Sequence, residues 1–271
     1  MTCGAKCATV GASARGGRPL LSTPPRLCYT EGVRLKLNSL EKKLFSAAQP
    51  DQAWGALIAS GVNNSVDLDT YLAKLNTLYQ QVAPEIPAAS ELRVAGALFD
   101  WLWHEKPNRC ERRGSYRLTE VLDAQLDPKI EKVGNCLGLT VLYHVLAQRL
   151  GLKVKAVHVE EAFGQGPHVF SILYTGQATI DIEHILPNGF DFKGHLHNPD
   201  RTEWGEAELI ADIYHSIGNK FFEQGSHEEA VQNYSKAIRL NPKYTKAYLN
   251  RALALFMLGR DKEATKDLEI I

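Results

Sequence analysis

An internal repeat of 34 residues near the C-terminal end constrains the fold of this chain more than any other feature. Like residues recur at that spacing in three pairs: Tyr214 with Tyr248, Gly225 with Gly259, and Ala230 with Ala264. A repeat of this length is typical of a helix–turn–helix unit that buries its apolar face against the next copy. Because fewer than three such units rarely stand alone, we expect the repeats to pack on the rest of the chain, to extend an array, or to pair with a partner.

These offsets resemble those of the tetratricopeptide repeat, and they predict one full and one partial repeat over residues 206–271. Small residues at Gly218, Ala230 and Ala237 predict that the two helices of a unit approach each other closely. The resemblance implies that a protein or peptide partner binds through the repeats.

A second pattern places a cysteine at the start of a helix. Asn135 is a good N-cap, apolar residues follow at helical spacing, and Leu150-Gly151 supplies a stop. Cys136 then lies in the first turn, where free N–H groups and the helix dipole favour a thiolate. The position suits a nucleophile, although most free cysteines are small buried apolar residues.

Three strand-like segments follow and add two chemical groups. Residues 153–159, 168–174 and 178–182 are strand-like and are separated by turn signals. His168 opens the second segment, and Asp181 lies in the third. A thiolate needs a base to carry its proton, and that imidazole needs a carboxylate to fix its tautomer. The predicted catalytic residues are therefore Cys136, His168 and Asp181.

This order of Cys136, His168 and Asp181 resembles the transglutaminase-like fold, a rearranged relative of papain-type thiol enzymes, over residues 91–192. Residues 67–75 and 117–122 are also similar to a bacterial SirB-like subfamily, which joins such a core to C-terminal tetratricopeptide repeats. Many members of that subfamily lack the nucleophile, whereas this chain keeps it. The chain departs from the common pattern in Val169-Phe170 after the histidine and in Ile182 after the aspartate. These departures leave the substrate class open.

The length of the turn before the third segment leaves open which carboxylate orients His168. If residues 175–177 form the whole turn, Tyr174 faces Ala178, and Asp181 lies several residues along the ladder from His168. Glu183 is then the alternative. The resemblance favours Asp181.

Composition narrows the partners and the compartment. The 271 residues include 31 basic and 31 acidic side chains and five cysteines. We expect no nucleic-acid partner, no membrane span and a cytoplasmic protein, because charge is balanced, long apolar runs are missing and no disulfide framework is present. No cofactor and no metal are expected. Cys3 with Cys7 lacks a matching second pair, and His195 with His197, expected on one face of a strand, is favoured as a surface pair.

The remaining sequence predicts a disordered tail over residues 1–30, a helical region over 31–106 and the transglutaminase-like core over 107–205. Helices are expected over 33–45, 52–58, 67–82, 118–126 and from Ser90 onward. The fold class is thus α+β: a helical N-terminal region, a papain-like thiol core and α-helical tetratricopeptide repeats.

Three functions follow, and the sequence leaves open whether the chain is an enzyme; the last of them is a metal-binding module that uses His195 and His197, and the other two are ranked above it. The first is thiol acyl transfer, by hydrolysis or transamidation, on an amide of a protein or peptide. The alternative is a non-catalytic protein–protein interaction scaffold or regulator with a relic core.

Overall fold

The computed structural model describes residues 33–176 and 178–271. The tail predicted over residues 1–30 lies outside these residues, together with Cys3, Cys7 and Cys28. Within the described part of the chain, no helix combines the length and the apolar character needed to cross a bilayer.

The N-terminal region is helical, as expected. Its elements are α1 (Ser39–Ser46), α2 (Gln52–Ala59), α3 (Ser65–Val82), the short 3-10 helix η1 (Ala83–Glu85) and α4 (Glu91–Glu105). The predicted start of the first helix at Val33 is wrong, because Asn38 caps the helix later. The Asn38 side chain accepts a hydrogen bond from the N–H of Glu41 at 2.9 Å, and the Glu41 carboxylate accepts one from the N–H of Asn38 at 3.1 Å.

Two further helices precede the sheet, α5 (Leu118–Leu126) and α6 (Cys136–Arg149). Most of α6 is buried, since α4 and α5 pack on it from one side and β1 and β2 from the other. The start that was predicted for this helix at Cys136 is confirmed.

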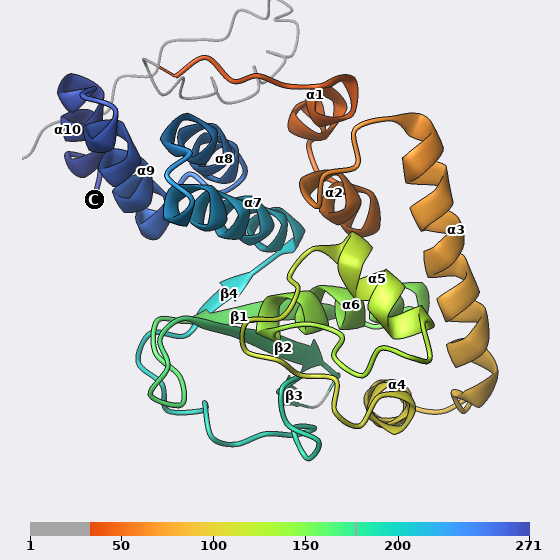
Figure 1. Cartoon of the computed structure of the whole chain (residues 1–271). Coiled ribbons are helices and arrows are strands. Elements are labelled where there is room, and N and C mark those ends of the chain that lie inside the picture. The colour runs from red at the N-terminus through yellow and green to blue at the C-terminus, as the bar shows by residue number, and fades with distance from the viewer. Residues whose placement is uncertain (1–32, 177) are drawn as a thin grey trace, which may run out of the picture. The chain divides into compact units, whose positions relative to one another are not determined.

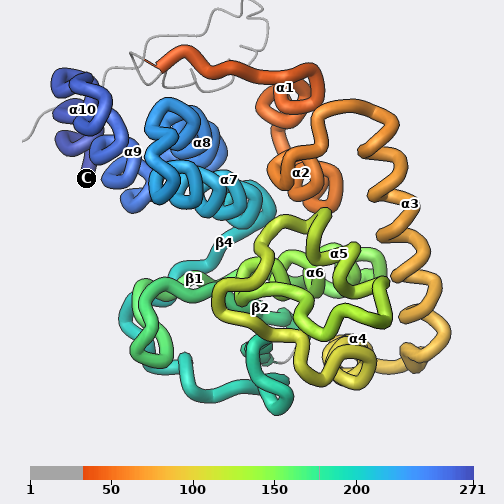
Figure 2. Tube along the Cα trace, in the orientation of Figure 1, coloured from red at the N-terminus to blue at the C-terminus, as the bar shows by residue number. Residues whose placement is uncertain are grey.

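The sheet contains β1 (Val154–Val159), β2 (His168–Tyr174), β3 (Thr179–Ile182) and β4 (Thr202–Trp204) in the order β3-β2-β1-β4, and every neighbouring pair is antiparallel (Figure 1). The three predicted strands are confirmed, whereas β4 was not expected. Figure 2 traces the long connection that leaves β3 and returns to the other edge of the sheet at β4. One face of the sheet joins the main core with α6, and the other carries a smaller cluster around Phe170 and Ile172.

The register of the hairpin between β2 and β3 differs from the expected one by one residue. Tyr174 pairs with Thr179 rather than with Ala178, because the connection runs from Thr175 to Ala178 and is closed by a hydrogen bond between their backbones at 2.9 Å. A shift of one residue moves side chains to the opposite face of a strand. Asp181, which now pairs with Ile172, therefore lies on the same face as His168.

The repeat region folds into α7 (Glu206–Glu223), α8 (His227–Leu240), α9 (Thr245–Met257) and α10 (Asp261–Leu268). Consecutive helices pack as antiparallel neighbours through short turns, as a helix–turn–helix repeat requires. The close approach predicted at Gly218 is confirmed, since a Cβ there would lie 2.6 Å from the Tyr234 ring of α8.

The repeats pack on the rest of the chain, which is one of the arrangements expected from their small number. Residues 33–271 form one unit, and the main hydrophobic core includes Ile210, Ile213 and Tyr214 of α7. Glu41 of α1 accepts hydrogen bonds from the Tyr214 hydroxyl at 3.1 Å and from the Lys236 ammonium at 2.7 Å. The repeat helices are therefore part of the core that supports the sheet.

Candidate functional site

The thiol of Cys136 is held at the first residue of α6 and is half-buried. The predicted N-cap is confirmed, because the Asn135 side chain accepts a hydrogen bond from the N–H of Gly138 at 3.1 Å. The backbone of Ser115 lies directly against this helix start. Its carbonyl accepts a hydrogen bond from the N–H of Asn135 at 3.0 Å, and a Cβ on Gly134 would lie 2.6 Å from the same oxygen. The thiol is thus fixed at the positive end of the helix dipole.

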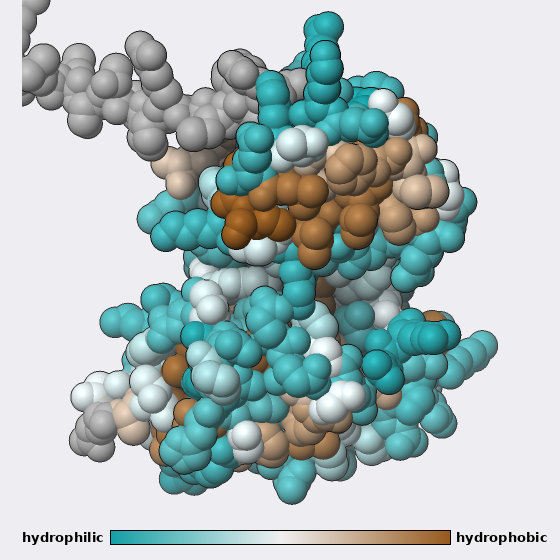
Figure 3. Space-filling model, turned by 90° about the vertical axis from the view of Figure 1, so that its left-hand side faces the viewer, coloured by the Kyte–Doolittle hydropathy of each residue, from teal (hydrophilic) through white to brown (hydrophobic). Residues whose placement is uncertain are grey.

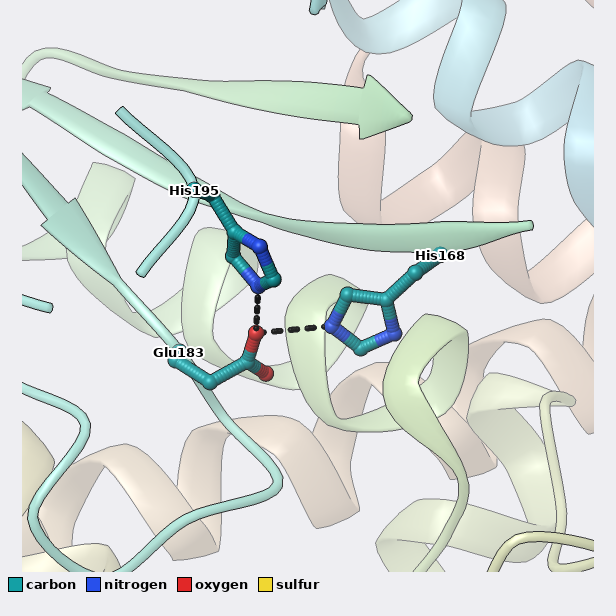
Figure 4. Close-up of side chains that lie close together, drawn as sticks. All are labelled: His168, Glu183 and His195. Atoms are coloured by element: carbon teal, nitrogen blue, oxygen red, sulfur yellow. Dashed lines mark hydrogen bonds and ion pairs between the residues drawn. The ribbon is translucent and has the colours of Figure 1, made fainter. Parts of the chain in front are cut away.

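His168 and Glu183 form the second part of the site. His168 is the first residue of β2, and Glu183 directly follows the end of β3. The His168 Nε2–H donates a hydrogen bond to Glu183 Oε2 at 2.7 Å (Figure 4). The Cys136 side chain lies near the His168 ring and acts to raise the pKa of the imidazole. The structure therefore brings together the thiol, the imidazole and a carboxylate.

That carboxylate is not the one that was assigned. Asp181 does not contact His168; its two carboxylate oxygens accept hydrogen bonds from the guanidinium of Arg201 at 2.7 and 2.9 Å. Asp181 pairs with Ile172, four residues along β2 from His168, a separation of about 13 Å at the usual rise per residue. The assignment of Asp181 as the orienting carboxylate needs correction, and Glu183, the alternative, occupies that position.

A second imidazole shares the same carboxylate. His195 Nε2 donates a hydrogen bond to Glu183 Oε2 at 2.9 Å, so one oxygen accepts from both rings (Figure 4). The His195 ring stacks on Phe170 with a centroid distance of 4.7 Å, and the edges of Phe163 and Phe192 face it at 5.0 Å. The imidazole is thus buried among aromatic rings, with its polar edge directed at Glu183.

The strand expected over residues 195–197 is absent, since this stretch forms a turn in the connection between β3 and β4. His195 is buried and His197 is exposed, so the two do not form the surface pair that was favoured. The structure assembles a different set, in which one ligand atom each from His168, Glu183 and His195 lies within 4.8 Å of the others. Two imidazoles and a carboxylate are a donor set that suits Zn²⁺ and related divalent cations.

The charges of the site follow from these contacts. Burial lowers the pKa of His168, but the nearby Cys136 and the hydrogen bond with Glu183 outweigh burial and raise the pKa to about 10. Burial raises the pKa of Glu183, but hydrogen bonds from His168 and His195 hold it at about 2. The other described cysteine, Cys110, has its pKa raised to about 11 by burial and by the neighbouring Cys136. Cys110 therefore stays a thiol at neutral pH.

A cavity of about 380 Å³ lies beside Cys136 and His168. Its opposite wall comes from the repeat region and includes Asp212 and His215 of α7 together with Tyr244. The Tyr244 hydroxyl donates a hydrogen bond to the Asp212 carboxylate at 2.6 Å. A group bound in this cavity contacts the thiol side and the repeat side at once.

Sequence reasoning named His195 but paired it with His197, and it missed the contact with Glu183 because this contact arises in an irregular connection. No periodicity marks residues 183–201, and neither the strand nor the pairing expected there is formed. Glu183 could be found as an alternative because it lies only two residues beyond Asp181 along the same segment.

Comparison with known proteins identifies the repeat region. Residues 218–259 match the family described as TPR repeat. The chain is 43% identical over 70 residues to Hsp70-Hsp90 organizing protein 1 of Glycine max, which is 26% of this chain and 12% of that protein. It is 37% identical over 71 residues to DnaJ homolog subfamily C member 7 of Homo sapiens, covering 26% of this chain and 14% of that protein.

A third relative is an uncharacterized protein of Methanocaldococcus jannaschii, 44% identical over 54 residues, which covers 20% of this chain and 63% of that protein. The chain thus spans only a small part of the first two relatives. No solved structure matches it. These findings support the tetratricopeptide part of the sequence interpretation and give no support to a transglutaminase-like core over residues 107–205, so the C-terminal region of this chain is identified as similar to TPR repeats.

Proposed function

We propose that this chain binds a protein or peptide partner through its repeat region. The observation that carries the proposal is the helix–turn–helix repeat itself, which agrees with the TPR match over residues 218–259 and with the relatives. The name of one of these relatives, Hsp70-Hsp90 organizing protein 1, associates it with Hsp70 and Hsp90, and these chaperones are therefore the first partners to test.

The repeat region also offers an apolar contact surface. Figure 3 shows a hydrophobic patch on the upper half of the molecule, where the repeat helices lie. The exposed apolar side chains of α9 include Leu249, Leu253, Phe256 and Met257. Buried apolar anchors supply most of the binding free energy at protein interfaces, so a partner segment with apolar side chains fits this surface.

Titration calorimetry of the full chain against purified Hsp70 and Hsp90 tests the proposal. Leu253→Ser should weaken binding at least tenfold, because it removes an apolar anchor that is 46% exposed. Val66→Ser on α3, where Val66 is 72% exposed, is the matched control and should leave binding unchanged. Equal affinity of the two variants for a bound chaperone would contradict a role of the α9 surface. Absence of binding to both chaperones would remove them as partners.

We also propose a second function, thiol acyl transfer on an amide of a protein or peptide, because one specific arrangement favours it. Cys136 at the start of α6, His168 at the start of β2 and Glu183 after β3 form the order of nucleophile, base and orienting carboxylate. The resemblance to a transglutaminase-like core agrees with this order. If the chain carries no such activity, the same arrangement is a relic core in an interaction scaffold.

The proposed reaction uses these groups in sequence. The Cys136 sulfur attacks the amide carbonyl carbon, and the imidazolium of His168 gives its proton to the leaving amine. The backbone N–H groups at the start of α6 point toward the developing oxyanion. His168 then takes a proton from water or from an acceptor amine, which attacks the thioester and frees the sulfur. Glu183 keeps the His168 ring oriented in both steps.

Alkylation by iodoacetamide, followed by mass spectrometry, tests the reactive thiol. Cys136 should be modified at pH 6.5 at least tenfold faster than Cys110, whose pKa is raised to about 11. His168→Ala should slow the modification of Cys136, because the imidazole partner of the sulfur is lost. Equal rates at the two cysteines, or no effect of His168→Ala, would favour the scaffold.

A further inference from the structure

We propose that His168, Glu183 and His195 form a binding site for a divalent cation of the Zn²⁺ class. The two imidazole Nε2 atoms approach one carboxylate oxygen at 2.7 and 2.9 Å, and the three ligand atoms lie within 4.8 Å of one another (Figure 4). A cation on Nε2 replaces the proton that this nitrogen shares with Glu183, so the metal-bound form is an alternative to the form that carries out acyl transfer, and the two proposals are tested separately.

The three ligands come from separate parts of the fold and converge on one point. His168 begins β2, Glu183 follows β3, and His195 lies in the connection to β4. Zinc bonds of about 2.0–2.1 Å in a tetrahedral site keep ligand atoms about 3.3 Å apart. The two N–O distances must therefore widen by about half an ångström, which requires a small movement of the Glu183 side chain away from His168 as well as a shift of the irregular segment that carries His195.

The burial of the three ligand side chains favours the binding of a cation between them. All three side chains are buried, and Glu183 is completely so. The rings of Phe163, Phe170 and Phe192 enclose His195, so the ligand atoms lie in an apolar shell that strengthens electrostatic attraction. A buried carboxylate must be paired, and two N–H donors or one cation can each satisfy this need.

The supporting contacts are those expected around metal ligands. The second oxygen of Glu183 accepts a hydrogen bond from the Ile185 N–H at 3.2 Å, which fixes the carboxylate. The backbone carbonyl of His195 accepts a hydrogen bond from Arg201, which in turn is held by Asp181. Such contacts orient the ligands.

An access route and a charge balance complete the site. His168 and Phe163 line the cavity beside the thiol, and Phe163 is 45% exposed over the two imidazoles. When the cation binds, Nε2 of His168 and Nε2 of His195 each release a proton to the solvent and form a bond to the cation. The Glu183 carboxylate then binds the cation in place of the two N–H groups. Water from the cavity can supply the fourth ligand.

The test uses the full chain, stripped with a chelator and titrated with Zn²⁺ and, for its absorption spectrum, with Co²⁺. One ion should bind per chain, and X-ray absorption of the zinc-loaded wild type should show two imidazoles with oxygen ligands and no sulfur. His195→Gln and Glu183→Gln should each weaken binding at least tenfold. His197→Gln, an exposed histidine two residues away, is the matched control and should leave binding unchanged.

Several results would overturn the proposal. Less than one ion per ten chains in the wild type would do so, as would sulfur in the absorption spectrum. Binding that persists in His195→Gln but is lost in Cys3→Ser/Cys7→Ser or in Cys136→Ser would assign the ion to cysteines. The wild-type stoichiometry and spectrum remain decisive even if a histidine variant fails to fold. Thiol alkylation in metal-free buffer measures the Cys136 proposal separately.

Discussion

Replacing His144 with glutamine should make the stability of the fold less dependent on pH below neutrality. His144 lies in the middle of α6, completely buried, and its Nε2 bonds the Ser171 hydroxyl at 2.9 Å. That hydroxyl also bonds His184 Nε2 at 2.6 Å. Burial lowers the pKa of His144 from 6.5 to about 3. The folded protein therefore keeps this imidazole neutral in acid, whereas the unfolded chain protonates it.

The sign and size of the effect follow from that difference. Stability from neutral His144 is fully present above pH 6.5, and it is lost as the pH falls toward 3, because the unfolded state then binds one more proton. Each pH unit in this window costs about 1.4 kcal/mol, so the loss between pH 7.5 and pH 5 amounts to about 2 kcal/mol. Glutamine places an amide nitrogen near the position of Nε2 and does not titrate.

Urea unfolding followed by tryptophan fluorescence at pH 7.5 and pH 5 measures the effect. Wild type should lose about 2 kcal/mol more unfolding free energy than His144→Gln over this interval, whatever the stability of the variant at pH 7.5. His104→Gln, at an exposed histidine on α4, is the control and should behave like the wild type. If wild type and His144→Gln lose the same unfolding free energy between pH 7.5 and pH 5, the His144 imidazole does not stay neutral in the folded protein over this range.

Three further predictions test particular contacts. Glu183→Gln should slow alkylation of the Cys136 thiol at least tenfold, because His168 loses its orienting carboxylate. Asp181→Asn alters the ion pair with Arg201 and should change the alkylation rate less than twofold. The reverse order of effects would restore Asp181 as the orienting carboxylate. Asp267→Ala should lower the unfolding free energy by about 3–5 kcal/mol, because it leaves the buried guanidinium of Arg251 without its carboxylate. Thermal unfolding measures this loss, and a loss as small as that of an exposed surface substitution would contradict it. Gly218→Val should lower the melting temperature by several degrees, since a Cβ there would lie 2.6 Å from the tyrosine ring of α8; an unchanged melting temperature would mean that α7 and α8 separate easily.

The site and the repeats are linked by packing as well as by sequence order. Tyr214 of α7 lies in the same core as the sheet, and Asp212 and Tyr244 line the cavity beside Cys136. Removal of residues 210–271 should therefore unfold the core rather than leave the thiol site intact. This differs from the behaviour of a repeat array joined by a linker, because here the repeats bury their apolar face on the chain that precedes them.

The sequence alone predicted the elements whose signals are local. The N-cap at Asn135, the strand that opens at His168 and the 34-residue spacing each depend on residues within a few positions or on a simple period, and the structure confirms the helix at Cys136, three of the strands and the helix pairs. Such features need no knowledge of distant contacts, since capping and amphipathic spacing act within one or two turns.

Tertiary structure decided which groups meet. One extra residue in the turn after Tyr174 set the register that puts Asp181 beside Ile172, and Arg201, 20 residues further along, took its carboxylate. Glu183 and His195 then met through an irregular connection that no period marks. These choices depend on the sum of packing, loop length and charge pairing across the whole chain, because a buried carboxylate goes to the partner that satisfies it in the folded state and not to the one nearest in a sequence pattern.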